Sequence, residues 1–225
     1  MTVADSVKRP LCARCLRPCR TCICPWVTPT PHAVEVVLLQ HPLEVAQAKG
    51  SARLLHLSLP NSLLVTGEVF DEARLQALLY APLDAAAGTP APAHTLLLYP
   101  DTPQDQARGL PAPPALAAKA LCEPARLRLI VLDGTWRKSH KMLYQNPLLQ
   151  QLPRLALRDL PASQYLIRQA PRPDQRSTLE ATCQALIQLE GDADKFLPLL
   201  AAFDGFVAQQ LGYRAAASAA GSGAP

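Results

Sequence analysis

The sequence predicts an α/β protein with a largely parallel sheet flanked by helices and a small cysteine-rich knuckle at its N-terminus. Short apolar runs such as 34–40 and 127–132 alternate with segments in which apolar residues recur at helical spacing. This alternation is typical of a parallel sheet covered by helices. Five of the seven cysteines lie between Cys12 and Cys24, and this crowding without a secretory signal indicates a metal site rather than disulfide bonds.

The expected strands are short, apolar and bounded by residues that favour turns. The first runs into His41-Pro42, and the strongest ends at Asp133-Gly134. Five segments fit this description: residues 34–40, 62–66, 94–99, 127–132 and, as a shorter candidate, 154–157.

Several of the expected helices carry local start or stop signals. Asp71 can cap a helix, and Ser177 with Glu180 three residues later forms a capping-box pattern. Pro147 interrupts the segment that begins at Trp136. The expected helices are residues 46–57, 72–80, 115–121, 136–144, 178–189 and 194–211.

Length and composition favour one catalytic or binding domain with a small appendage. The 225 residues, 49% of them hydrophobic, can build one well-packed core but not comfortably two. We expect a knuckle over residues 1–30, a main domain over 31–213 and a disordered tail over 214–225. No long apolar run or signal-peptide pattern occurs, so we expect a cytoplasmic, soluble protein without membrane association or an obligate protein partner.

Positive charge is concentrated in two blocks of the chain. Residues 1–24 carry five Lys and Arg against one acid, and residues 126–176 carry ten against three, whereas the remaining blocks are acidic. Such blocks suggest a polyanionic partner, although a solvated surface explains them equally simply. The sequence has no P-loop and no Rossmann glycine fingerprint, which disfavours those modes of nucleotide binding.

The knuckle contains one C-x-x-C and one C-x-C pair. Four thiolates can close a tetrahedron around zinc, and the outer pairs have the tighter chelating spacings. We therefore choose Cys12, Cys15, Cys22 and Cys24 as ligands and leave out Cys19, which could substitute. An iron–sulfur cluster, a redox dithiol or a metal-free tail are the alternatives. A closed zinc site would fold the N-terminus and present its basic side chains.

Unusual residues follow three strands, at the edge where ligands bind in parallel sheets. Asp133 can act as a general base, although it could equally cap the next helix. Thr135 can orient Asp133 or contact a ligand, and Trp136 can stack on a ligand ring or anchor the core. His41 and Glu44 are secondary candidates for substrate contact.

An ordered set of motifs resembles the DTW-domain family. The signature Asp133-Gly134-Thr135-Trp136 lies among further matching blocks, and the resemblance covers most of the chain. These blocks are the cysteine cluster and residues 39–44, 98–100, 137–139 and 177–181. The resemblance implies a tRNA-uridine aminocarboxypropyltransferase that uses S-adenosylmethionine, on a SPOUT-like fold with a C-terminal trefoil knot. It also implies action on the variable loop for bacterial members, a type that the short chain favours, and on the D-loop for eukaryotic relatives.

The resemblance and the charge pattern together give the expected site. The catalytic residues are expected to be Asp133, Thr135 and Trp136. Residues expected to contact the cofactor are Leu98, Tyr99, Pro100, Asp133, Gly134, Trp136, Ser177 and Thr178, the last two at a helix N-terminus that can bind an anion. Residues expected to contact RNA are Arg137, Lys138, Lys141, Arg168, Arg172 and Arg176.

Two other functions use the same features. A SPOUT-like RNA methyltransferase would share the cofactor and the basic surface. A non-catalytic, zinc-containing RNA-binding protein would use the α/β body as a scaffold.

Overall fold

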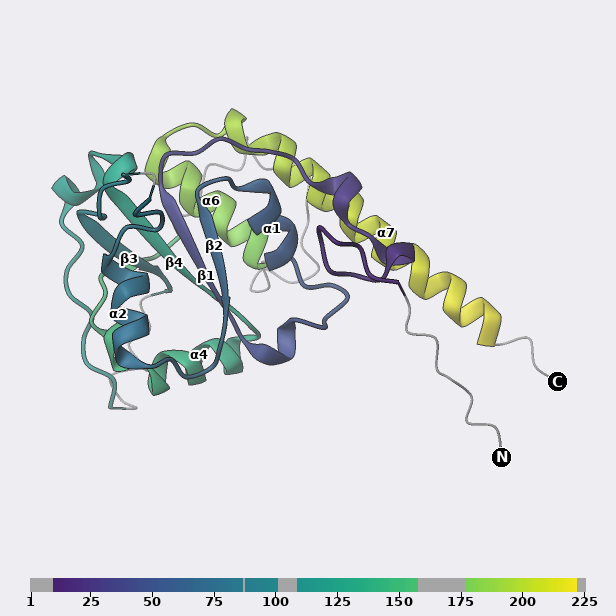
Figure 1. Cartoon of the computed structure of the whole chain (residues 1–225), viewed down its shortest axis with the longest axis horizontal. Coiled ribbons are helices and arrows are strands. Elements are labelled where there is room, and N and C mark those ends of the chain that lie inside the picture. The colour runs from purple at the N-terminus through teal and green to yellow at the C-terminus, as the bar shows by residue number, and fades with distance from the viewer. Residues whose placement is uncertain (1–9, 87, 101–108, 158–176, 222–225) are drawn as a thin grey trace.

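The main body is built on a five-stranded sheet. The computed structural model describes residues 10–86, 88–100, 109–157 and 177–221. All strand pairs are parallel, and their order is β2-β1-β4-β3-β5 (Figure 1). The strands are β1 Glu35–Gln40, β2 Ser62–Thr66, β3 His94–Leu98, β4 Leu127–Asp133 and β5 Arg154–Leu155. The predicted α/β class, the parallel sheet and the five strands are therefore confirmed.

Helices cover both faces of the sheet because successive strand residues point to opposite sides. Val36 and Leu38 belong to the core that includes α1, α6 and α7, whereas Val37 and Leu39 belong to the core that includes α2, α4 and α5. The central strands are buried on both sides, as expected for a parallel sheet. The helices are α1 Ala52–Ser58, α2 Glu72–Tyr80, α4 Trp136–Gln145, α5 Pro147–Gln150, α6 Thr178–Glu190 and α7 Leu197–Gly221.

Two expected helices are shorter in the structure than predicted. The first begins at Ala52 rather than at residue 46, and a distant side chain contacts the loop that precedes it. Arg17 donates to the carbonyl oxygens of Ala48 at 2.6 Å and of Gly50 at 2.8 Å. The helix expected at 115–121 is only a 3-10 turn, Ala118–Leu121, which follows a proline-rich stretch.

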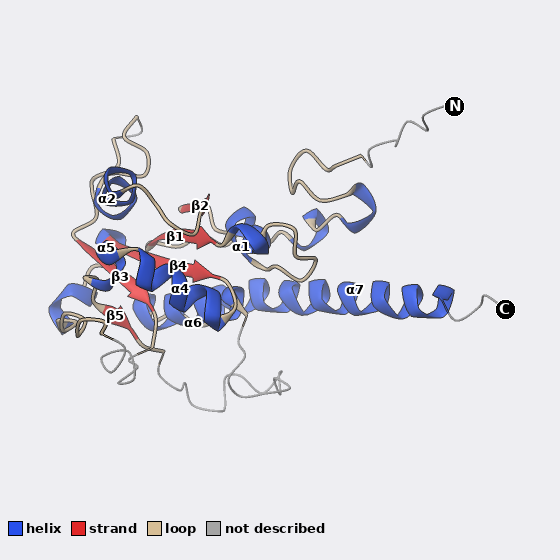
Figure 2. Cartoon of the chain, turned by 90° about the horizontal axis from the view of Figure 1, so that it is seen from below, coloured by secondary structure: helices blue, strands red, loops and turns tan. Residues whose placement is uncertain are grey.

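The N-terminal knuckle packs along α7, the long helix that projects beyond the sheet (Figures 1 and 2). The indole of Trp26 donates to the side chain of Gln209 at 3.1 Å, and the hydroxyl of Tyr213 donates to the carbonyl of Arg20 at 2.9 Å. Although α7 is long, no helix within the described ranges combines the length and apolar composition needed to cross a membrane.

The end of α7 differs from the expected tail. The helix continues to Gly221, so residues 214–221 are helical rather than disordered. This stretch is rich in alanine, which has the highest helix propensity, and extending a formed helix is much easier than nucleating one.

A glycine on α7 makes the close approach of Trp26 possible. A Cβ atom at Gly205 would lie only 2.1 Å from the Trp26 ring, whereas one at Gly212 meets nothing within 4 Å. We expect Gly205→Ala to lower the free energy of unfolding by about 1–3 kcal/mol through overpacking. Gly212→Ala is the matched control and should stabilise the helix slightly. Urea unfolding measures both, and equal stabilities of the two variants would contradict this packing.

Candidate active site

A cleft of about 640 Å³ opens at the carboxyl ends of β3, β4 and β5. This is the edge of a parallel sheet at which ligands bind, and the volume is typical of small-molecule sites. The lining residues come from three strand ends, from the start of α4 and from the start of α6. They are Leu98, Tyr99, Pro100, Val131, Leu132, Gly134, Thr135, Trp136, Ser139, Leu155, Ala156, Leu157, Thr178 and Ala181.

Two aromatic rings are stacked at this cleft. The centroids of Trp136 and Tyr99 are 5.1 Å apart, with an angle of 19° between the ring planes. The guanidinium of Arg154 lies 5.1 Å from the centroid of the Tyr99 ring. Tyr99 is 4% exposed and Arg154 6%, but Trp136 is 55% exposed. The indole is therefore supported from the core by a buried ring while much of its own surface remains accessible.

Asp133 lies beside this cleft but is not among its lining residues. It is 5% exposed, and both of its carboxylate oxygens accept hydrogen bonds. Gln40, its partner across the β1–β4 register, donates from Nε2 to Oδ2 at 2.9 Å. Thr178 donates from Oγ1 to Oδ1 at 2.6 Å. Burial raises the pKa of the carboxyl, although these two hydrogen bonds act in the opposite direction.

The raised pKa of Asp133 predicts a stability cost at neutral pH. The folded state holds the Asp133 proton more tightly than the unfolded state does. The stability gained in this way is fully present below the usual pKa of 3.8 and is lost as the pH rises through the higher pKa of the folded state. Asp133→Asn should therefore be more stable than the wild type at pH 7, by about 1.4 kcal/mol for each unit of the shift. The difference should disappear as the pH falls toward 3.8. Thermal unfolding of both proteins between pH 4 and 8 measures it, and a variant less stable at neutral pH would contradict the interpretation.

The N-terminus of α6 is capped by the protein itself. Ser177 and Glu180 form the predicted capping box. The amide of Leu179 donates to the Ser51 hydroxyl at 3.2 Å, and the amide of Glu180 donates to the Ser177 hydroxyl at 3.2 Å. Two donors that an anion could have used are thus already occupied. Of the predicted pair, Thr178 lines the cleft and Ser177 does not.

Two of the predicted basic residues are held in ion pairs. Lys138 lies 2.7 Å from Glu44, and Lys141 lies 2.9 Å from Glu68. The ring of His41 also contacts Glu68, at 3.1 Å. These pairs connect α4 to the loops that follow β1 and β2. They partly neutralise the expected basic ridge, in which Arg137 is exposed.

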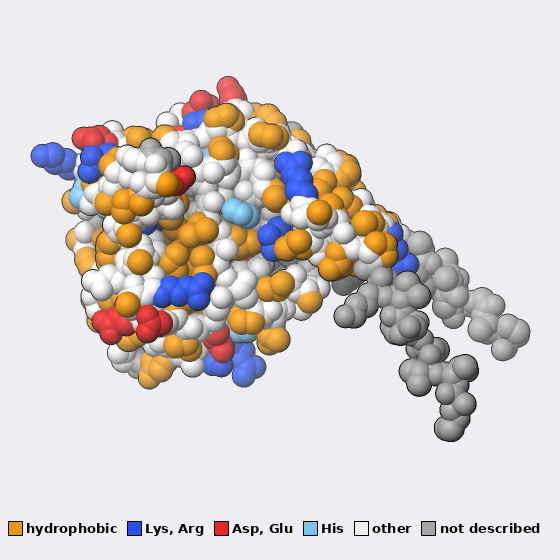
Figure 3. All heavy atoms as spheres, viewed as in Figure 1, with side chains coloured by type: hydrophobic (Ala, Val, Ile, Leu, Met, Phe, Trp, Pro, Cys, Tyr) orange, Lys and Arg blue, Asp and Glu red, His pale blue; other side chains and the backbone are white. Residues whose placement is uncertain are grey.

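Several other basic residues of the block 126–176 are either buried or outside the described residues. Arg128 and Arg154, both within the basic block 126–176, are buried. On the face seen in Figure 3, the Lys and Arg side chains form separate groups rather than one continuous patch. Arg168, Arg172 and Arg176 lie outside the described residues.

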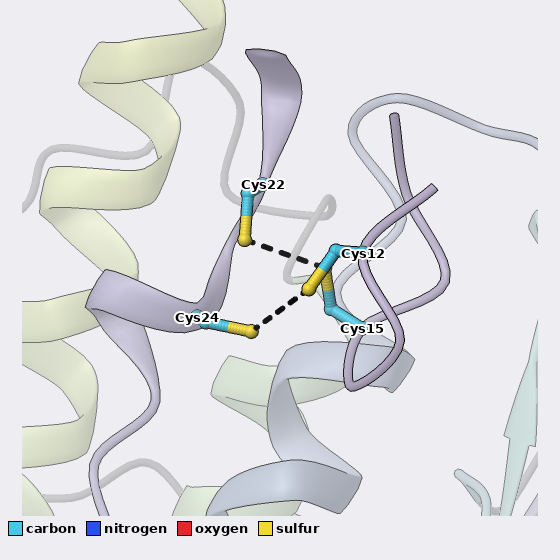
Figure 4. Close-up of side chains that lie close together, drawn as sticks. All are labelled: Cys12, Cys15, Cys22 and Cys24. Carbon is cyan, nitrogen blue, oxygen red and sulfur yellow. Dashed lines mark hydrogen bonds between the residues drawn. The ribbon is translucent and has the colours of Figure 1, made fainter. Parts of the chain in front are cut away.

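The four cysteines chosen from their spacing come together in the knuckle (Figure 4). Their sulfur atoms all lie within 4.8 Å of one another. The Sγ atoms of Cys12 and Cys24, and those of Cys15 and Cys22, are 3.7 Å apart. Around zinc, tetrahedral thiolates at 2.3 Å would be separated by roughly 3.8 Å. The cluster is therefore compatible with a structural metal, and Cys19 is exposed outside it.

Sequence reasoning missed several residues of the cleft. The Ser139 hydroxyl donates to the carbonyl of Gly134 at 3.3 Å, and Ala156 and Ala181 also line the cleft. Ser139 and Ala181 lie within the matching blocks 137–139 and 177–181, but their small side chains indicated no role there, and Ala156 lies in no such block. Gln40 was within a quoted motif, but only the strand register reveals that it reaches Asp133.

The fold and the cleft define an α/β protein with a candidate ligand site at the carboxyl edge of a parallel sheet. The model of the DTW domain matches residues 9–211. This chain belongs to the DTW-domain family. No solved structure matches it significantly.

The curated relatives carry a consistent name. The chain is 30% identical to mouse tRNA-uridine aminocarboxypropyltransferase 2 over 84% of its own length, and 32% identical to the Drosophila melanogaster protein of that name over 81%. It is also 30% identical over 60% of its length to Arabidopsis thaliana tRNA-uridine aminocarboxypropyltransferase A. The aligned region spans 60%, 68% and 51% of these relatives, respectively.

Proposed function

We propose that this protein transfers the 3-amino-3-carboxypropyl group of S-adenosylmethionine to N3 of a tRNA uridine. The observation that carries the proposal is the cleft beside Asp133, with its supported indole, in a family whose curated relatives are named for this transfer. The target would lie in the variable loop and the by-product would be methylthioadenosine. A cytoplasmic location, a knuckle over residues 1–30, a catalytic domain over 31–213 and a SPOUT-like knot belong to the same proposal.

The cleft suits a ligand of this size and chemistry. S-adenosylmethionine supplies an electrophilic methylene carbon bound to a sulfonium. Leu98, Pro100 and Gly134 would contact it through strand-end loops, as the family resemblance implies. Thr178 is the better placed of the two α6 candidates because it lines the cleft. Ser177 would act mainly by capping α6.

The uridine N3 must lose its proton before it can attack carbon effectively. Asp133 is the proposed general base, since burial raises the pKa of its carboxyl toward the range useful at neutral pH. Thr135, which precedes α4 at the cleft, is proposed to help position the reacting groups. No step in this scheme needs a metal near the cleft.

Trp136 is proposed to stack on a ligand ring, because Tyr99 supports it and 55% of its surface is exposed. Trp136→Ala should weaken binding of that ligand by about 1–3 kcal/mol, or roughly 5- to 150-fold. Trp136→Phe should lose less. Tyr144→Ala removes an aromatic ring that is 59% exposed on the same helix and serves as the control. Equilibrium binding of S-adenosylmethionine and of tRNA identifies the ligand, and unchanged binding of both would contradict the stacking role.

Arg137, Lys138 and Lys141 are proposed to contact tRNA phosphates from one helix. Binding of the RNA would then compete with the Glu44 and Glu68 ion pairs and weaken as salt increases. Arg168, Arg172 and Arg176 remain part of the proposed RNA contact.

Zinc is the proposed occupant of the cysteine cluster. An all-thiolate tetrahedron is typical of structural zinc sites, and the separation of the sulfur atoms fits it. The closed ligand set gives the metal a role in folding the knuckle rather than in the reaction.

The test is incubation of the protein with tRNA and S-adenosylmethionine, followed by mass spectrometry of the nucleosides. The proposal expects a uridine carrying the aminocarboxypropyl group, together with methylthioadenosine. A methylated nucleoside with S-adenosylhomocysteine would instead identify an RNA methyltransferase. Binding of tRNA without any modified nucleoside would favour the non-catalytic, zinc-containing RNA-binding protein.

A further inference from the structure

A short chain of hydrogen bonds connects strand β1 to the cleft through Asp133. Gln40 donates to Oδ2 of Asp133 at 2.9 Å, and Thr178 donates to Oδ1 at 2.6 Å. We propose that the Thr178 hydroxyl relays the N3 proton of the target uridine to Asp133, and that Gln40 is a positioning residue for that carboxylate. This inference rests on the proposed function and adds the route of the proton.

The first support is accessibility. A general base must come within hydrogen-bonding distance of the proton that it removes. Asp133 is 5% exposed and does not line the cleft, whereas Thr178 is partly exposed and does. A group between the buried carboxylate and the substrate can carry the proton, and Thr178 both lines the cleft and donates its hydroxyl to Asp133.

The second support is the direction of the hydrogen bond. A threonine hydroxyl has one proton and two lone pairs. Because Thr178 gives its proton to Asp133, its oxygen can act toward the cleft only as an acceptor. That is the polarity required to receive a proton from an imide nitrogen.

The transfer balances in atoms and charge. The N3–H proton passes to Oγ1 of Thr178 while the original hydroxyl proton passes to Oδ1 of Asp133. The nitrogen electron pair forms the new bond to the methylene carbon, and the electrons of the carbon–sulfur bond remain on sulfur. One carboxylate becomes neutral and one sulfonium becomes a neutral thioether, so no further reactant is required.

Gln40 fixes the orientation of the carboxylate. It lies opposite Asp133 in the parallel register, and the backbone amide of His41 donates to the carbonyl of Asp133 at 2.9 Å. The hydrogen bond from the Gln40 side chain to Oδ2 leaves Oδ1 directed at Thr178. The charged group that acts on Asp133 is Glu44, which raises the pKa of its carboxyl and is itself paired with Lys138. On α6, Glu180 accepts from the Ser177 amide.

Thr178→Val tests the relay because it keeps the shape and removes the hydroxyl. We expect the single-turnover rate at saturating substrates to fall by about 10²-fold or more, a loss larger than any change in the affinity for S-adenosylmethionine, which Thr178 is also proposed to contact. Thr178→Ser should recover most of the rate. Thr182→Val is the matched control, since Thr182 is fully buried one turn further along α6 and bonds only to the Thr178 carbonyl in the described contacts.

The pH profile separates positioning from a structural effect. Gln40→Met removes the donor that favours the charged carboxylate, so the acid limb of the rate profile should move upward by about one pH unit. Thr178→Val should regain rate as alkali takes over removal of the imide proton.

The outcomes distinguish the two levels of the proposal. If the wild type makes no aminocarboxypropyl uridine, the proposed function fails. If the wild type is active and Asp133→Asn is inactive, but Thr178→Val retains the wild-type rate and pH profile, the relay alone is overturned. Loss of S-adenosylmethionine affinity in Thr178→Val without a loss of rate at saturation would likewise replace the relay with a binding role.

Discussion

Replacing Cys12 and Cys22 together by serine is expected to abolish metal binding and to detach the N-terminal knuckle from α7. Each replacement removes one thiolate from a different close pair of the cluster. Structural zinc contributes about 10–16 kcal/mol of apparent binding free energy in small zinc-finger peptides, and that energy is folding energy. Elemental analysis should find one zinc ion per wild-type chain and none in the double variant.

The knuckle offers a matched control within the same segment. Cys19 is exposed and lies outside the four-sulfur cluster, so Cys19→Ser should keep the metal and the wild-type melting temperature. The double variant should become sensitive to proteolysis near Trp26, because the contacts of Trp26 with Gly205 and Gln209 depend on an ordered knuckle. A metal-free wild type, or a double variant that retains its metal, would refute the assignment.

Arg17 connects the knuckle to the loop before α1 and to α7. Its guanidinium holds the carbonyl oxygens of Ala48 and Gly50 and lies 5.3 Å from the centroid of the Phe206 ring. Ser51, next in the chain, accepts from the amide of Leu179 in α6. Metal loss is therefore expected to loosen the loop before α1 as well as the knuckle.

Local sequence signals predicted the elements that depend on local energy. The apolar runs located β1 and β4 to within one residue, and the Asp71 side chain caps α2 as expected. The Ser177 and Glu180 pair marked the start of α6. In contrast, the loop before α1 is held by Arg17, which lies more than 30 residues away. No pattern within 46–57 carries that information.

The candidate site likewise contains some features that local sequence signals predicted and others that only the tertiary structure reveals. The signature and the block 98–100 were expected at strand ends, and the parallel sheet brings Leu98, Tyr99 and Gly134 to one cleft. The contact between Gln40 and Asp133 required the β1–β4 register, and the contact with Thr178 required the docking of α6. These tertiary contacts are determined by the packing of whole strands and helices rather than by the local sequence around Gln40, Asp133 or Thr178.

The basic block shows where charge counting fails. Arg128 was counted with the positive residues of 126–176, yet its side chain is 0% exposed. It donates through Nε at 2.9 Å and Nη2 at 2.6 Å to Glu35, its partner in the strand register, and through Nη1 at 2.9 Å to the Leu78 carbonyl. The Arg128 guanidinium therefore connects the sheet to α2, and its charge is not available to bind a polyanion.

This buried pair predicts a large loss of stability when one partner is removed. Arg128→Met should lower the free energy of unfolding by about 3–5 kcal/mol, because the Glu35 carboxylate is left uncompensated in a buried position. The double variant Glu35→Leu, Arg128→Met should recover most of this loss, since apolar side chains of similar volume often replace a buried ion pair without net cost. Urea unfolding of the three proteins measures the difference.

Arg126→Met provides the comparison on the same segment. Arg126 is exposed, so its replacement should change stability by no more than about 0.5 kcal/mol. If Arg128→Met were as stable as Arg126→Met, the pair would contribute nothing to the sheet and the burial argument would be wrong. If the single variant lost stability but the double variant recovered none of it, the loss would arise from the Leu78 carbonyl and from packing rather than from the orphaned Glu35 charge.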